Sequence, residues 1–307
     1  MAMKKIPENH LLNEIYVPES GKGFKRWLAV IALFFITFLL TFPFEKTIIA
    51  QVEKAINSQR ACPISYESVS LTWFAPGLDF EKPVISGNCF QRPGSDLPLN
   101  NMALSFAGPN FSPIGVRFKV LIESENSRLE AYPAVGIGEQ VVRITDTTIG
   151  EDIFAALTGM NIIASSLSVD GLITMAENQI SSAKFKVESK RFKTRSTNIK
   201  GFDLMAMDLG NFVLLAEMDA AAKLFVEKLS FGEANSTLAG NFKGNITLNR
   251  FNMLYSNADL TGEVRFSEEL TNAIPLINIF IQGKQPIDGF YKLEIKGPLG
   301  QTRPNFL

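Results

Sequence analysis

One apolar run near the N-terminus constrains this chain more than any other feature. Residues 27–44 read WLAVIALFFITFLLTFPF and carry no charge, and their only polar side chains are Thr37 and Thr41. As a helix, the run would span about 27 Å, close to the hydrocarbon thickness of a bilayer. We therefore predict a transmembrane helix over residues 27–44. The alternatives are a buried core helix and a cleavable signal peptide, but no A-x-A-like cleavage site follows the run.

The charges before the run predict its orientation. Basic residues outnumber acidic ones over residues 1–26, and two of them directly precede the apolar run. The basic residues are Lys4, Lys5, Lys22, Lys25 and Arg26, against Glu8, Glu14 and Glu19. The positive-inside rule then predicts that residues 1–26 form a cytoplasmic tail, which includes the one histidine, His10. The chain after residue 44 would lie outside the inner membrane of a bacterium, in the periplasm.

The two cysteines, Cys62 and Cys89, both follow the predicted span. In an oxidising compartment they can form a disulfide, which would stabilise the fold by about 3–4 kcal/mol in the chain-entropy model. The alternative is two buried, reduced thiols. The predicted topology favours the disulfide.

A short amphipathic helix is predicted directly after the span, over residues 45–60. Ile48, Ile49, Val52 and Ile56 recur at helical spacing, with charged and amide side chains between them. Such a helix either lies on the lipid surface or packs on the domain that follows.

Residues 61–307 are predicted to form a β-rich domain. Apolar and polar residues alternate in ISYESVSLTW from position 64, in VRFKVLI, in KFKVESKRF and in FKGNITL. In YKLEIK the alternation places Tyr291, Leu293 and Ile295 inward. Such alternation is typical of half-buried antiparallel strands. The expected fold class is mainly β: a long curved antiparallel sheet with a few short helices, either as one unit or as two halves divided near residues 145–160.

Glycines and helix signals subdivide this domain. A loose repeat of an apolar residue, one further residue and a glycine recurs in SVDGLITM, TLAGNFKGNITL and ADLTGEVRF, and predicts glycines at bends or bulges. The pairs Asp170–Gly171 and Gly108–Pro109 are read as turn signals. Helices are expected over residues 151–157 and 268–280, the second kinked or broken at Pro275. The excess of phenylalanine, 25 residues against 5 tyrosines, indicates either core packing or an apolar surface for a lipid or an extended polypeptide.

Composition and motifs argue against several classes of function. A net charge of −1 argues against a general nucleic-acid binder. One histidine and two cysteines exclude most metal sites, and neither a P-loop nor an H-E-x-x-H motif occurs. The carboxylates considered for acid–base work are better explained as a solvated face; they are Asp203, Asp208, Glu268 and Glu269. We expect no catalytic residue and no cofactor.

The chain resembles protein N of the bacterial type II secretion system in its longer form. The resemblance rests on the single span ending in TFPFEK, the amphipathic helix, the glycine-containing strand repeats, and the final strand GFYKLEIKGPLG over residues 289–300. It also extends to the longer AsmA-like membrane-anchored β proteins. The resemblance implies a non-enzymatic accessory subunit at the inner membrane, whose β domain binds other secretion subunits. The alternative that it implies is a periplasmic protein that binds or transfers lipid.

Overall fold

The computed structural model describes residues 27–34, 37, 44–58, 62–72, 76–90, 92, 94–159, 161–177, 179–199, 202–233, 235–249 and 255–307. The chain divides into two units, Met1–Glu53 and Lys54–Leu307. In the first unit, residues 27–34 are helical and exposed to solvent. Within the described residues, no helix has both the length and the apolar character needed to cross a membrane. The predicted tail and much of the predicted span (residues 35–36 and 38–43) lie outside the described residues.

The helix predicted after the span is present as α3 (Phe44–Ser58). It begins one residue earlier than predicted, and residues 59 and 60 lie outside the described part of the chain. Ile49, Val52 and Ile56 are half-buried, whereas Lys46 and Glu53 are exposed. The amphipathic pattern in the sequence therefore matches the pattern of burial.

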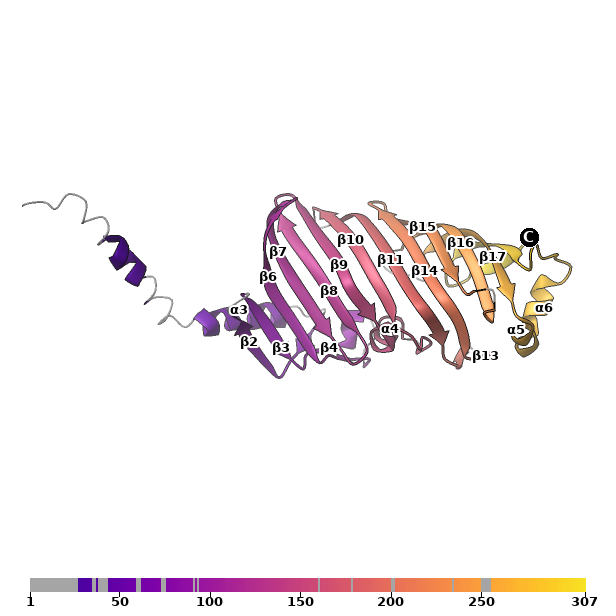
Figure 1. Ribbon diagram of the computed structural model, residues 1–307, viewed down its shortest axis with the longest axis horizontal. Coiled ribbons are helices and arrows are strands. Elements are labelled where there is room, and N and C mark those ends of the chain that lie inside the picture. The colour runs from indigo at the N-terminus through magenta and orange to yellow at the C-terminus, as the bar shows by residue number, and fades with distance from the viewer. Residues whose placement is uncertain are drawn as a thin grey trace, which may run out of the picture. The chain divides into compact units, whose positions relative to one another are not determined.

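The second unit is built on one antiparallel sheet of fourteen strands, which confirms the mainly β prediction (Figure 1). Its strands, in the order in which they lie side by side, are β19 (Arg303–Phe306), β18 (Tyr291–Pro298), β17 (Asn257–Phe266), β16 (Leu238–Thr247), β15 (Lys223–Phe231), β14 (Met207–Asp219), β11 (Gln179–Thr194), β10 (Leu167–Ala176), β9 (Glu139–Ile149), β8 (Arg128–Gly136), β7 (Ile114–Glu123), β6 (Asn101–Phe111), β3 (Gly77–Glu81) and β2 (Ser68–Thr72). The sheet continues without a break from β9 to β10, so it is one unit rather than two halves.

Two small sheets accompany the large one. β1 (Ile64–Ser65), β4 (Val84–Ile85) and β5 (Leu97–Pro98) form the first, and β12 (Thr197–Ile199) and β13 (Phe202–Leu204) form the second. The single strand expected from position 64 is wrong: the chain leaves β1 at residue 66 and starts β2 at Ser68. A disulfide joins Cys62 to Cys89, which lies in the short 3-10 helix η1 (Gly87–Phe90).

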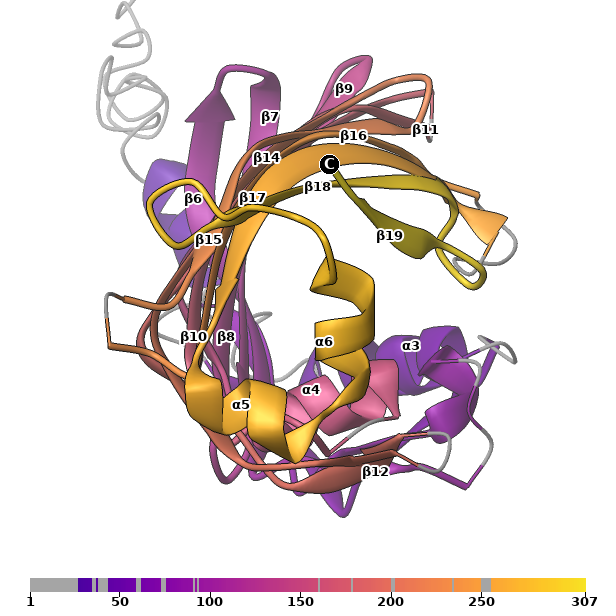
Figure 2. The same cartoon turned by 90° about the vertical axis from the view of Figure 1, so that its right-hand side faces the viewer.

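The short helices lie where the sequence predicts them. α4 (Glu151–Thr158) ends at Gly159, which has a left-handed φ of 70°. α5 (Glu268–Ala273) and α6 (Leu276–Ile281) are separated at Pro275, as expected for a proline inside a helical pattern. Figure 2 shows the sheet bending through an arc, with α4 and α6 on its inner side.

Polar contacts fix α4 to the turn between β7 and β8. The hydroxyls of Ser124 and Ser127 both donate hydrogen bonds to the carboxylate of Asp152 in the first turn of α4. Burial alone would raise the pKa of Asp152, but these two hydrogen bonds lower it below its ordinary value. This turn is therefore tied down by its own side chains, which orients α4 under the sheet.

The glycines of the loose repeat have two roles. Gly171 adjoins a register shift, and Gly244 has a φ of 144° beside another, as predicted for bends and bulges. Gly240 and Gly262 instead lie in regular register. A Cβ on Gly262 would lie 2.3 Å from the carbonyl oxygen of Asn241 and 2.5 Å from a ring atom of Phe242. The repeat therefore also makes room for phenylalanine rings.

Two turn predictions are wrong. Asp170–Gly171 lies inside β10, and Gly108–Pro109 lies inside β6 next to a register shift. Both pairs mark irregularities within long strands rather than chain reversals, because β-bulges favour the same residues as turns.

Candidate functional site

The inner side of the curved sheet is apolar from one edge to the other. Directly opposed register partners form one row that crosses all fourteen strands and contains no polar side chain. From β2 to β19 this row, which we call the apolar row, consists of Leu71, Leu78, Leu104, Val120, Ala131, Ile144, Gly171, Phe185, Ala216, Val226, Gly244, Leu260, Ile295 and Pro304. With adjacent strands about 4.8 Å apart, the apolar row is about 60 Å long.

Helix contacts identify this face as the concave one. Ile153 of α4 belongs to a buried cluster against which Ile122 of β7 and Ile149 of β9 pack, and both of these lie on the same side of the sheet as the apolar row. Ile281 of α6 packs against the cluster formed by Phe242 and Leu293. Because both helices lie on the inner side of the arc in Figure 2, the apolar row lines that side. We call it the concave face.

The opposite face of the same strands is mostly polar, with Leu172 and Phe225 as exposed apolar side chains on it. The neighbouring row from β8 to β18 points outward and consists of Tyr132, Arg143, Leu172, Lys184, Glu217, Phe225, Asn245, Asp259 and Lys296. Charged side chains on it pair with one another; Lys184 and Glu217, for example, form an ion pair across β11 and β14. The convex face therefore has the character of a solvated surface, whereas the concave face is apolar.

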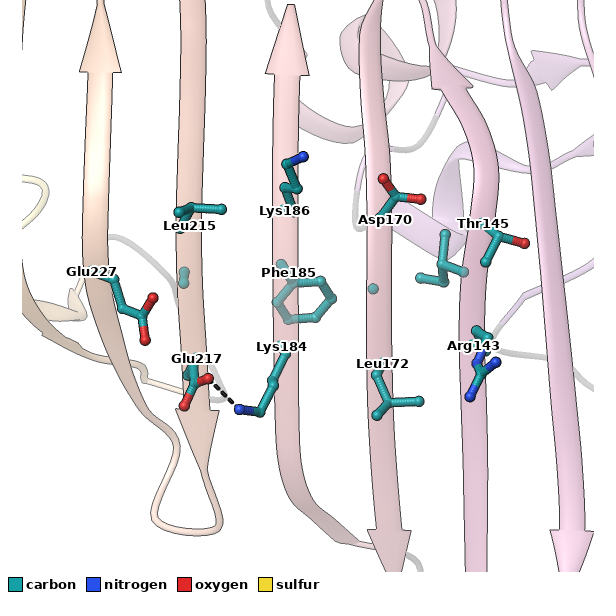
Figure 3. A pocket seen from close by; sticks show the side chains of 13 residues that line it. Arg143, Thr145, Asp170, Leu172, Lys184, Phe185, Lys186, Leu215, Glu217 and Glu227 are labelled. Carbon is teal, nitrogen blue, oxygen red and sulfur yellow. Dashed lines mark hydrogen bonds and ion pairs between the residues drawn. The ribbon is translucent and has the colours of Figure 1, made fainter. Parts of the chain in front are cut away.

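A hollow of about 420 Å³ on the convex face shows the character of that side (Figure 3). Arg143, Lys184 and Lys186 line it together with three carboxylates, from Asp170, Glu217 and Glu227. The hydrogen bond with Glu217 raises the pKa of Lys184 above its ordinary value. The positive and negative charges balance within the hollow, so it offers no excess charge to an ionic ligand.

Cover over the concave face is uneven. Phe242, Val264, Leu293 and Phe306 are no more than 8% exposed, in a cluster over β16–β19 that we call the covered region. On β6–β8, in contrast, Leu104, Phe106, Val116 and Val135 are exposed by 38–45%, and we call this the open region. Large apolar side chains on the concave side of a sheet are normally buried, so the open region is an apolar surface that this fold leaves exposed on its concave side.

Phenylalanine supplies much of the concave face. The rings of Phe231 and Phe242 stack with centroids 6.0 Å apart, and Phe106 meets Phe118 edge-on at 6.2 Å. Across the strands, Phe185 pairs with Gly171, and Phe231 pairs with Gly240. The phenylalanine excess and the glycine repeat are thus two parts of one arrangement, which the sequence alone did not connect.

The carboxylates considered in the sequence lie on separate elements. Asp208 is in β14 and pairs with Lys193 at 2.8 Å, and this hydrogen bond lowers its pKa. Glu268 and Glu269 begin α5 and are exposed, while Asp203 lies in β13. Within the described residues, no three His, Cys, Asp or Glu side chains are grouped so as to hold a metal ion. Asp203, Asp208, Glu268 and Glu269 therefore do not form one constellation.

No protein-family model, no curated protein and no solved structure matches this chain.

Proposed function

We propose that this protein is a membrane-anchored envelope protein that binds the acyl chains of lipids on its concave face. The observation that carries the proposal is the apolar row, which crosses all fourteen strands without a polar side chain. Its length of about 60 Å compares with about 15 Å for the hydrocarbon of one bilayer leaflet. Five members of the row are no more than 8% exposed, so acyl chains would meet the row at its exposed members, among them Leu104 at 38%; the five are Leu78, Ala131, Ala216, Val226 and Leu260.

The exposure of the open region supports the same proposal. Leu104 and Phe106 are 38% and 41% exposed, although they point to the side that forms a core elsewhere in the sheet. Leaving apolar side chains in water costs free energy, roughly 25 cal/mol for each Å². A ligand with acyl chains would recover that free energy, whereas a polar ligand would not.

The location is proposed from the sequence. Residues 27–44 would anchor the chain in the inner membrane, with residues 1–26 in the cytoplasm and the sheet in the periplasm. The disulfide between Cys62 and Cys89 supports this placement, because such bonds persist in oxidising compartments. The protein would act by binding, without a catalytic residue or cofactor.

The test uses two leucines with matched exposure on opposite faces. Leu104 on the concave face is 38% exposed and Leu172 on the convex face is 37% exposed. The full-length protein should co-purify with phospholipid that mass spectrometry detects after extraction. Leu104→Glu should lose most of this lipid, because it places a charge in the apolar row, and Leu172→Glu should retain it. Wild-type protein without lipid, or equal loss in both variants, would refute the proposal.

A second candidate is the accessory subunit of type II secretion implied by the resemblance. The supporting observation is β2, whose five residues form one edge of the sheet among the described residues and include no proline. Such an edge suits strand addition by a partner subunit. The strand at the other edge, β19, contains Pro304, which weakens pairing there.

The two candidates predict different phenotypes of a deletion strain. A secretion subunit would leave secreted enzymes in the periplasm, and complementation would restore their export. A lipid-binding protein would leave export intact and change lipid composition or outer-membrane permeability. Comparing extracellular and periplasmic proteins in the same strains separates the two.

A further inference from the structure

Two neighbouring hairpins expose large apolar side chains at their tips. β6 and β7 turn at Ser112–Pro113, where Phe111 is 85% and Ile114 is 72% exposed. β8 and β9 turn beside Ile137, which is 89% exposed. The backbone N–H of Ile137 donates to the carbonyl oxygen of Ile114 at 3.3 Å, so the two tips lie side by side. We call these three side chains the apolar tip.

The apolar tip continues the concave face. Phe111 pairs with Ile114, and two residues further along β7 Val116 pairs with Val135 of β8. Because side chains alternate along a strand, Ile114 and Val116 share the face of Val120 in the apolar row. The open region therefore runs to the end of the hairpins, where it emerges from the sheet.

The opposite side of the same hairpins is cationic and polar. A hollow of about 400 Å³ lies there, and its lining includes Arg117, Arg143 and the polar side chains of Asn110, Ser112 and Tyr132. Two arginines contribute to it and no carboxylate does. Glu139 lies at the start of β9 on the same face as Arg143, and Glu130 is engaged by Lys119 at 2.8 Å. Arg143 lines both this hollow and the hollow of Figure 3, whereas Arg117 lines only this one, so Arg117 supplies the positive charge that distinguishes it.

This arrangement has the layered chemistry of a surface that enters a membrane interface. Interfacial segments bury apolar side chains at the boundary between headgroups and acyl chains, and keep cations beside them at the level of the phosphates. Arginine binds phosphate oxygens through two N–H groups at once, which suits it to this position. Anionic lipid would add attraction over a short distance.

We propose that the apolar tip inserts into an anionic phospholipid bilayer, with Arg117 and Arg143 binding headgroup phosphates. The inference deepens the proposed function. Only one part of it rests on that function, namely that lipid would move between the bilayer and the concave face along the apolar side chains of the tip. The insertion of the tip into the bilayer is argued independently, from the apolar tip and the two arginines.

The experiment labels the tip and the opposite rim of the sheet in the full-length protein. An environment-sensitive dye is attached at Ile137→Cys, or at Glu125→Cys in the polar turn between β7 and β8 as the matched control. Each protein is reconstituted in vesicles of phosphatidylcholine, with or without phosphatidylglycerol. We expect a blue shift at position 137 that is larger with phosphatidylglycerol, and none at position 125. No shift at 137, or equal shifts at both positions, would overturn the inference.

Two variants separate the contributions. In the first variant, Phe111→Ser is combined with the dye at position 137. Its apparent affinity for vesicles, measured by the dye, should fall about tenfold or more, since burying one aromatic side chain is worth that much. Arg117→Gln with Arg143→Gln should remove the preference for phosphatidylglycerol and leave the weaker signal with phosphatidylcholine. A shift that depends on protein concentration and not on vesicles would instead identify a second copy of the chain as the partner, and would overturn the inference.

The outcome is distinguishable from failure of the proposed function. Lipid that co-purifies with wild type but not with Leu104→Glu tests the concave face, and the dye at position 137 tests the tip. Lipid retained without a dye shift would refute insertion alone. A dye shift without co-purified lipid would refute lipid binding on the concave face and leave insertion standing.

Discussion

The covered and open regions of the concave face share one sequence pattern and differ in what lies over them. In the covered region, α6 contributes Ile281 to a cluster in which Phe242 is 7% and Leu293 is 4% exposed. In the open region, Phe106 and Val135 are 41% and 45% exposed. Alternation determines which face of a strand is apolar, but cover determines whether that face becomes a core or remains a surface. The comparison predicts that equivalent substitutions affect stability in one region and ligand binding in the other.

The largest expected effect is on stability in the covered region. Phe242→Ala should lower the free energy of unfolding by about 3–5 kcal/mol, because it removes a buried ring and leaves a cavity. Phe106→Ala should lower it by only about 1–2 kcal/mol, because much of that ring is already in water. Urea unfolding of the full-length variants measures both. Equal losses would mean that the open region is a core like the other, and the comparison would fail.

The repeat glycines allow the comparison to be made by adding atoms rather than removing them. Gly262→Ala should cost about 1–3 kcal/mol, because its Cβ would collide with backbone and with the ring of Phe242. Gly171→Ala should cost less than about 1 kcal/mol, since the nearest atom to its Cβ is a ring carbon of Phe185 at 3.2 Å. The same unfolding measurement ranks the two. A larger loss at Gly171 would contradict the uneven packing of the concave face.

Much of the fold follows from local pattern. Tyr291, Leu293 and Ile295 lie on one face as their alternation predicts, and the helical segment after Ser267 breaks at Pro275 for the reason that proline imposes. These features depend on residues close in sequence. They are set by the spacing of side chains along a strand and by the geometry of proline.

The candidate site could be predicted only in part, because it depends on register between strands. The alternation in VRFKVLI identifies an apolar face, but it does not show that Val120 continues into a row that includes Phe185 and Leu260. Nor does it show that Ile281, far along the chain, packs over the β16–β18 end of the sheet while Phe106 on β6 stays exposed. Long-range packing decides both, and no local pattern reports it.

The open region has little cover on its concave side, and a polar cluster on the convex side links its strands instead. Glu130 is 6% exposed, accepts hydrogen bonds from Lys119 and Tyr132, and its backbone N–H donates to Thr147. The hydrogen bond from Lys119, and then that from Tyr132, lowers the pKa of Glu130 to about 2. This cluster links β7, β8 and β9 through hydrogen bonds and an ion pair next to the open region.

That lowered pKa predicts a loss of stability in acid. Because the pKa of Glu130 is lower in the folded chain, its contribution is complete above the ordinary pKa near 4.5 and is lost as the pH falls toward about 2. Glu130→Gln should therefore make the free energy of unfolding depend less steeply on pH in this range. Summed over the range, the loss of stability in acid should be smaller by on the order of 1–2 kcal/mol. Urea titrations at several pH values measure the slope. Glu263→Gln on β17 serves as the control, and an unchanged slope in Glu130→Gln would contradict the lowered pKa of Glu130.

The smallest expected effect on stability is at the apolar tip, where the open region leaves the sheet. Ile137 is 89% exposed, so Ile137→Ser should change the free energy of unfolding by no more than about 0.5 kcal/mol, as is usual for surface substitutions away from packed features. Ser127→Ala, in the tied turn at the opposite rim, should cost more, because Ser127 bonds both Asp152 and the backbone N–H of Gly150. Thermal unfolding without vesicles compares the two. A loss of more than about 1 kcal/mol in Ile137→Ser would exceed the usual surface effect and assign the tip to the folding core. A neutral result would show that Ile137 does not stabilise the fold, which supports a role for the tip in binding a bilayer.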